Sequence, residues 1–134
     1  MKDVEGKKIQ QGFPGKVCVV TVTYGNRFKY LEKVIDSCLK EGVGKIIVVD
    51  NDSHPESRQK LEELEKKEAK LKVIYLDENK GSAGGYKIGL KEAYKCKKCE
   101  FILCLDDDNM LSSNSLKKLY GLLTYLGKDR KSVV

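Results

Sequence analysis

The stretch Phe101-Ile102-Leu103-Cys104-Leu105-Asp106-Asp107-Asp108 joins an apolar run directly to three carboxylates. An apolar run of this length between polar residues is typical of a buried strand in a parallel sheet. Ligands of such sheets bind outside the carboxyl ends of the strands. Because adjacent carboxylates repel one another, we expect a cation among them, and Mg²⁺ or Mn²⁺ there would hold a diphosphate. A solvated acidic turn or a helix cap is the alternative.

Strands and helices are predicted to alternate on both sides of this stretch. Apolar, β-branched runs predict strands at residues 16–22, 45–49 and 71–76. Apolar spacing predicts helices at residues 28–41, from a Ser53 cap to about 70, from glycines 81–85 to about 95, and from Ser112 or Ser113 onwards. This order predicts an α/β fold with a Rossmann-like, doubly wound and mainly parallel sheet. Residues 132–134 look like the start of another strand.

The composition is that of a globular domain. The chain has 134 residues, 40% hydrophobic and 34% charged, which is enough for one domain with a core. Its net charge of +6 accompanies no nucleic-acid-binding signature, so no nucleic-acid partner is expected. No apolar run approaches the ~20 residues of a membrane span, and residues 1–15 are too polar for a secretory signal. We therefore expect a cytoplasmic protein, with any membrane association arising from chain beyond Val134.

The cysteines include one pair with a recognisable spacing. Cys96-Lys97-Lys98-Cys99 has the spacing of half a zinc site, but no second pair follows it among the five cysteines. A redox motif with this spacing normally opens a helix, whereas this one follows a predicted helix. The pair is therefore interpreted as incidental.

Polar groups follow three of the predicted strands and are expected to converge at one edge of the sheet. Besides the aspartate triplet, they are Thr21–Asn26 and Asp50-Asn51-Asp52. A carboxylate such as Asp50 can accept the N3 hydrogen of uracil or thymine, and Tyr24 can pack against the ring. Gly81–Gly85 follows a strand and opens a helix, where glycine lets the backbone approach a ligand. Together these features favour a nucleotide-diphosphate pocket.

Four segments in this order resemble the family 2 inverting glycosyltransferases, over about residues 16–111. They are Val19–Arg27, Ile46–Ser53, Asn79–Tyr86 and Leu105–Asp108. The resemblance implies the A-type glycosyltransferase fold, a Rossmann-like nucleotide-binding domain followed by an acceptor-binding part. Residues 79–86 are most similar to the galactofuranosyl- and rhamnosyltransferase branch.

The resemblance also implies a set of site residues. A nucleotide-sugar site would comprise Thr23, Tyr24, Asp50, Gly84, Gly85, Asp106 and Asp107, and a site for Mn²⁺ or Mg²⁺ would comprise Asp106 and Asp108. Thr23 and Tyr24 would border the base, and Asp50 would accept its N3 hydrogen. The two glycines would let the helix start approach the donor, and Asp107 would contact the ribose or the sugar. Arg27 either helps to neutralise phosphate or lies at the surface.

The implied reaction is inverting sugar transfer from a UDP- or dTDP-sugar to a hydroxyl of a glycan or lipid-linked acceptor. The family's catalytic base follows the aspartates by more residues than remain here, so we expect it beyond Val134. Residues 1–15 would then be a polar N-terminal segment, and residues 16–134 a nucleotide-sugar-binding domain cut before its acceptor-binding part. Two alternatives are a non-catalytic nucleotide-sugar-binding module and a receiver-like signalling domain phosphorylated at Asp77.

Overall fold

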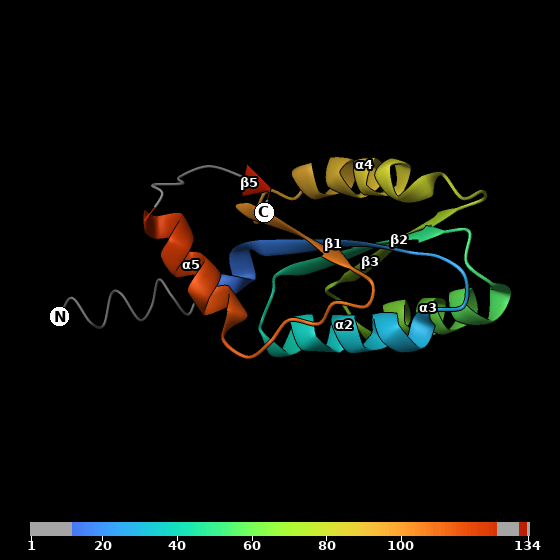
Figure 1. Ribbon diagram of the computed structural model, residues 1–134, viewed down its shortest axis with the longest axis horizontal. Helices are drawn as coiled ribbons and strands as arrows, with labels where there is room; N and C mark the ends of the chain where they lie inside the picture. Colours follow the sequence, from blue (N-terminus) through green and yellow to red (C-terminus); the bar gives the residue numbers. More distant parts are fainter. Residues whose placement is uncertain (1–11, 126–131, 134) are drawn as a thin grey trace.

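The computed structural model describes residues 12–125 and 132–133, and the fold is shown in Figure 1. Its strands are β1 (Val17–Thr23), β2 (Lys45–Asn51), β3 (Leu71–Leu76), β4 (Phe101–Asp106) and β5 (Ser132–Val133). Its helices are the short 3₁₀ helix η1 (Pro14–Lys16), α2 (Phe28–Lys40), α3 (Pro55–Lys67), α4 (Gly81–Tyr94) and α5 (Ser115–Tyr125). None of the described helices is long and apolar enough to cross a membrane.

The strands form one sheet in the order β3-β2-β1-β4-β5, and every neighbouring pair is parallel. The order reverses between β1 and β4, so the sheet is doubly wound, as predicted. The register pairs Thr23 with Asp50 and Val22 with Asp106, which places the polar strand ends at one edge. The predicted further strand is confirmed at residues 132–133; Val134 and the predicted polar segment 1–11 lie outside the described residues.

Helices cover both faces of the sheet. Helices α2, α3 and α5 lie on one side and α4 on the other (Figure 1). Side chains alternate across a strand, so Val19 of β1 packs into the α2 side while Val20 packs into the α4 side. Both valines are completely buried, which explains why the strand reads as a continuous apolar run.

Two predicted helix starts are wrong by a few residues. Ser53 does not cap α3: its buried hydroxyl has no hydrogen-bond partner among the described residues, and α3 begins at Pro55 with His54 as its N-cap residue. The residue before a proline favours extended backbone, and His54 has ψ 145°, which keeps it out of the helix. The last helix begins at Ser115 rather than near Ser112, because Asn114 adopts a positive φ of 65°.

Gly89→Ala is expected to lower the free energy of unfolding by about 1–3 kcal/mol, because it overpacks the contact of α4 with the sheet. A Cβ at Gly89 would lie 2.5 Å from Cγ1 of Val20, whose β-branched side chain is stiff. Gly121→Ala in α5 is the matched control: its Cβ meets nothing within 4 Å, so we expect a gain of about 0.5–1 kcal/mol. Urea denaturation measures both, and effects of the same sign would contradict this packing.

Candidate functional site

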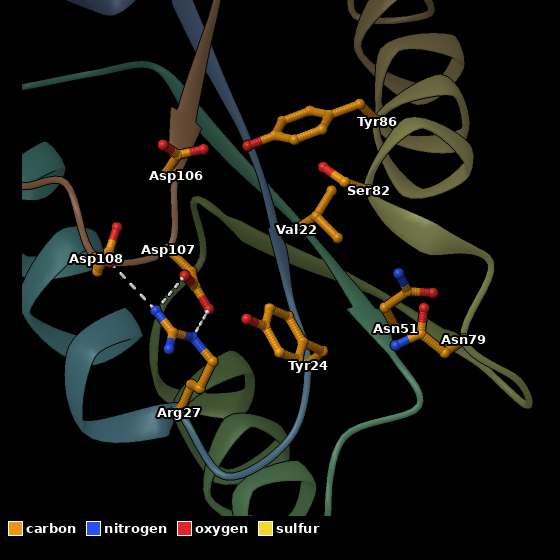
Figure 2. Close-up of a pocket in the computed structure, with 10 residues that line it drawn as sticks. All are labelled: Val22, Tyr24, Arg27, Asn51, Asn79, Ser82, Tyr86, Asp106, Asp107 and Asp108. Carbon is orange, nitrogen blue, oxygen red and sulfur yellow. Dashed lines mark hydrogen bonds and ion pairs between the residues drawn. The ribbon is translucent and has the colours of Figure 1, made fainter.

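A pocket of about 420 Å³ opens at the carboxyl ends of β1, β2 and β4, beside the start of α4 (Figure 2). This is the switch point of the sheet, where open α/β sheets bind ligands. The lining residues are Val22, Tyr24, Arg27, Asn51, Asn79, Ser82, Tyr86, Asp106, Asp107 and Asp108. Segments far apart in the sequence therefore meet here, as the sequence predicts.

The three aspartates differ in their surroundings. Asp106 is the last residue of β4 and is exposed, and Asp108 keeps 56% of its side chain exposed. Asp107, between them, is only 5% exposed. The triplet therefore presents its two outer carboxylates to solvent and turns the middle one inward.

Arg27 and Thr23 hold the Asp107 carboxylate. Arg27 Nε donates to Oδ2 at 2.8 Å, Arg27 Nη2 donates to Oδ1 at 3.0 Å, and Thr23 Oγ1 donates to Oδ2 at 3.0 Å. The hydrogen bonds with Asp107 raise the pKa of Arg27 above its usual range, against the opposing effect of burial, so the guanidinium stays charged. Arg27 Nη2 also donates to Asp108 Oδ2 at 3.3 Å. One positive charge thus lies between two carboxylates (Figure 2).

Two tyrosines form opposite parts of the pocket. Tyr24 is 51% exposed, and the Arg27 guanidinium lies 5.3 Å from its ring centroid, a cation–π contact. Tyr86 of α4 donates its hydroxyl to the carbonyl of Leu105 at 2.6 Å. Burial, with the nearby Asp106 carboxylate, raises the pKa of Tyr86 to about 12, so it remains a neutral phenol. Tyr24 offers an accessible ring face, and Tyr86 fixes α4 against the end of β4.

Asn51 joins the end of β2 to the start of α4. Its Nδ2 donates to the Gly81 carbonyl at 2.9 Å, and its Oδ1 accepts the Lys80 N–H at 2.8 Å. Gly81 has a φ of +75°, a conformation that favours glycine. Asn79 Oδ1 accepts the Gly81 N–H at 2.8 Å, so asparagine side chains already bind the N–H groups of Lys80 and Gly81. The backbone N–H groups that follow, from Ser82 onwards, begin α4 beside the pocket.

Asp50, predicted to read the base, does not line the pocket. Its side chain has no exposed surface, Oδ1 accepts the Ser53 N–H at 2.8 Å, and Oδ2 accepts Arg58 Nε at 3.0 Å. Arg58 also donates to the Leu76 carbonyl at 2.6 Å. Asp50 therefore joins the end of β2 to α3 and, through Arg58, to the end of β3.

Thr23 and the two glycines also lie outside the pocket lining. Thr23 is 3% exposed, and its hydroxyl donates a hydrogen bond to Asp107. A Cβ on Gly85 would come within 2.7 Å of Val22 Cγ1, so this glycine permits close approach to the sheet. A Cβ on Gly84 would lie 3.0 Å from the Cβ of Lys80, within the same segment. Of the predicted residues, the structure brings Tyr24 and the aspartate triplet together.

Sequence reasoning did not assign several lining residues to the site. Asn51, Asn79, Ser82 and Tyr86 belong to segments that the motifs already span. Ser82 and Tyr86 are four residues apart near the start of α4, and such spacing places them on one helix face. That spacing is the signal that could have identified them.

The carboxylates of the pocket suit a divalent metal whose coordination is completed by oxygen atoms of a bound ligand. Within residues 12–125 and 132–133, no three carboxylate, imidazole or thiolate groups converge into a metal site. Two exposed carboxylates, Asp106 and Asp108, do line one pocket. Hard oxygen ligands are those that Mg²⁺ prefers, and it is commonly bound by one or two carboxylates plus substrate phosphates. The residues therefore fit Mg²⁺ or Mn²⁺ shared with a diphosphate.

Comparisons with known proteins identify relatives of this chain. The chain is 29% identical over 104 residues to the "Putative teichuronic acid biosynthesis glycosyltransferase TuaG" of Bacillus subtilis (strain 168), covering 76% of this chain and 39% of that protein. The crystal structure of S. aureus TarS 1-349 superposes with a TM-score of 0.66 at 26% identity, covering 82% of this chain and 32% of that one. The same TarS region in complex with UDP gives a TM-score of 0.66 at 27% identity.

The present chain thus spans about two fifths of TuaG and about a third of TarS 1-349. Its α/β sheet is that of A-type glycosyltransferase structures. The model of the family described as "Glycosyl transferase family 2" matches residues 18–131. The chain belongs to glycosyl transferase family 2.

Proposed function

We propose that this chain is the donor-binding domain of a metal-dependent, inverting glycosyltransferase that uses a UDP- or dTDP-sugar. One observation carries the proposal: the outer carboxylates of the triplet, Asp106 and Asp108, face a pocket while Arg27 neutralises Asp107. Three carboxylates beside one guanidinium leave a local excess of negative charge that a divalent cation would balance. The UDP complex of the related TarS structure supports a uridine nucleotide as the ligand.

Each part of the pocket suits a part of such a donor. A divalent ion, when bound, supplies positive charge that stabilises the negative charge of the leaving diphosphate. Asp106 and Asp108 would hold that ion, and the first turn of α4 after Gly81 would direct backbone N–H groups at phosphate oxygens. Tyr24 offers its ring to the base, and Asp107, held rigid by Arg27, would contact the ribose or sugar. Thr23 would contribute indirectly, through its hydrogen bond to Asp107. Gly84 and Gly85 would contribute by allowing α4 to lie close to the sheet.

The proposal assigns no residue of this pocket to the activation of the acceptor. Among the described residues, the acidic side chains that line this pocket are the three aspartates, which the proposal assigns to the donor. General-base activation of a glycan or lipid-linked hydroxyl would then come from chain beyond Val134. Diphosphate release measured with and without acceptor, for this chain and for a longer one, tests that assignment; rapid acceptor-dependent turnover by residues 1–134 would contradict it.

The non-catalytic alternative keeps the pocket and removes the transfer. Binding of nucleotide sugar by the longer chain, with no transfer to any acceptor, would favour it. The receiver-like alternative finds no support, because Asp77 is exposed after β3 and does not line the pocket.

UDP at about 100 times its Kd is expected to stabilise the chain by about 2.7 kcal/mol when Mn²⁺ is present, and by less when it is absent. Thermal melting with and without Mn²⁺ measures this difference. Asp106→Asn and Asp108→Asn should each remove the Mn²⁺-dependent part, since each loses a carboxylate that faces the diphosphate. An identical shift with and without Mn²⁺ would show that the metal assignment is wrong.

Asp36→Asn provides the matched control for charge removal. Asp36 pairs with Lys40 on the surface of α2, with 60% of its side chain exposed, and does not line the pocket. Its nucleotide-induced shift should equal that of the unmodified chain. Replacing UDP by dTDP in the same series tests whether the site distinguishes uracil from thymine.

A further inference from the structure

Cys96 and Cys99 meet at the end of the sheet opposite the pocket. They lie between α4 and β4, at the amino ends of the strands, whereas the pocket lies at the carboxyl ends. Their Sγ atoms are 2.8 Å apart. Closing to the ~2.05 Å of a disulfide would require a movement of about 0.8 Å, which side-chain rotation can supply. From its spacing alone the pair was interpreted as incidental, but the structure brings the two sulfurs into contact.

We propose that Cys96 and Cys99 form a thiol–disulfide exchange site, in which Cys96 attacks an external disulfide and Cys99 resolves the product. The two cysteines differ in exposure, as an attacking and a resolving cysteine should. Cys96 is partly exposed and lies among the exposed residues Lys95, Lys97 and Lys98, whereas Cys99 is only 3% exposed. An external reagent can therefore reach Cys96, while Cys99 reacts with its neighbour. The lysines favour an anionic disulfide such as oxidised glutathione.

The turn at residues 96–99 provides the donors that a helix start provides in other redox motifs. Partial burial opposes ionisation of Cys96, but hydrogen bonds from the Cys99 thiol and from the backbone N–H groups of Cys99 and Lys98 lower its pKa. Burial, with the bond to Cys96, raises the pKa of Cys99 to about 12. The attacking thiol is thus the more readily ionised of the two, and thiolate is the nucleophile. The position of the two cysteines after α4, rather than at a helix start, therefore does not prevent the ionisation of Cys96.

The exchange balances without a further reagent. The Cys96 thiolate attacks one sulfur of RS–SR, the new Cys96–SR bond forms, and RS⁻ leaves. Cys99 then loses its proton and attacks Sγ of Cys96, which forms the Cys96–Cys99 disulfide and releases a second RS⁻. The two cysteines lose two electrons and two protons, and the external disulfide becomes two thiols.

A metal is the competing ligand for a cysteine pair. Structural zinc takes four ligands, and within residues 12–125 and 132–133 no third cysteine, histidine or carboxylate completes a site. The thiol of Cys18 interacts with Cys99 but is completely buried in β1. The observations therefore favour disulfide exchange over metal binding.

The test uses the full chain in glutathione redox buffers, followed by alkylation and tryptic mapping. Trypsin cuts after Lys97 and Lys98, so a Cys96–Cys99 disulfide joins two peptides that separate on reduction. Because Cys104 shares the Cys99 peptide, mapping is done both in Cys104→Ser and, with fragmentation, in the unmodified chain. We expect the joined peptides in oxidising buffer. Their absence at every glutathione ratio would overturn the proposal.

Two variants separate the roles. Cys99→Ser should trap a stable glutathione adduct on Cys96, and Cys96→Ser should give neither adduct nor disulfide. In reduced protein, Cys96 should be alkylated about tenfold faster than Cys104, a partly exposed thiol whose pKa is raised by burial. No adduct in Cys99→Ser, equal alkylation rates, or zinc bound to the purified chain would each count against the exchange site.

Discussion

Asp107→Ala is expected to lower the free energy of unfolding by about 3 kcal/mol, the lower end of the range for breaking a buried ion pair. Removing this 5% exposed carboxylate leaves Arg27 without two hydrogen bonds and Thr23 without one. The effect lies at the lower end because Arg27 is 26% exposed and keeps its contact with Asp108. Urea denaturation monitored by circular dichroism measures it.

The neighbour Asp108 supplies the control for that variant. It also pairs with Arg27, but its side chain is 56% exposed, so Asp108→Ala should cost at most about 1 kcal/mol. In nucleotide binding we expect the larger loss from Asp108→Ala, because Asp108 is assigned to the metal, whereas Asp107, held by Arg27, is assigned a single contact with the ribose or sugar. A double-mutant cycle with Arg27→Ala should locate the coupling energy at Asp107. Equal stability losses for the two aspartate variants would refute this division of the triplet.

The central strand β1 could be predicted closely from the sequence because it is buried on both faces along its whole length. The edge strand β3 has the predicted bounds Leu71–Leu76 although Lys72 is exposed, because its other residues are apolar or aromatic. Helix starts were less certain, because they depend on local turns. At α3 the Ser53 N–H binds the Asp50 carboxylate, and the helix begins two residues later, at Pro55, with the Ser53 hydroxyl buried and not capping it.

The site was predictable in its location and less so in its internal order. The triplet identified the edge of the sheet, but which carboxylate turns inward depends on Arg27, 80 residues earlier in the chain. The glycines led us to predict a close approach of the start of α4 to the donor. Sequence cannot say what is approached, and for Gly85 the structure shows the Val22 side chain rather than an open pocket.

Asp50→Ala is expected to cost about 3–5 kcal/mol of stability, because it leaves the Arg58 guanidinium without its buried partner. Arg58 links three elements: it lies on α3, bonds Asp50 of β2, and donates to the carbonyl that ends β3. The Asp36→Ala variant, which breaks an exposed pair with Lys40, should cost at most about 0.5 kcal/mol. Comparable losses of stability in Asp50→Ala and Asp36→Ala would show that the buried Asp50–Arg58 pair stabilises the fold no more than an exposed pair does.

Base recognition by Asp50 is proposed in addition to this structural role, and Asp50→Asn separates the two. Each carboxylate oxygen already accepts one hydrogen bond and retains a second lone pair, but the side chain has no exposed surface. Reading the N3 hydrogen of uracil therefore requires the end of β2 to open when the nucleotide binds. If it does, UDP should bind more tightly than CDP by about 1.5–3 kcal/mol, since cytosine has no N3 hydrogen to donate.

Asp50→Asn should reduce that preference, because an amide is a weaker acceptor than a carboxylate and can turn its own donor toward the base. Titration calorimetry with UDP and CDP, below the melting temperature of each variant, measures the ratio independently of stability. A ratio near one in the unmodified chain, or an unchanged ratio in Asp50→Asn, would confine Asp50 to joining β2, β3 and α3. The base would then be held by groups that already face the pocket, with the exposed ring of Tyr24 as the first to test.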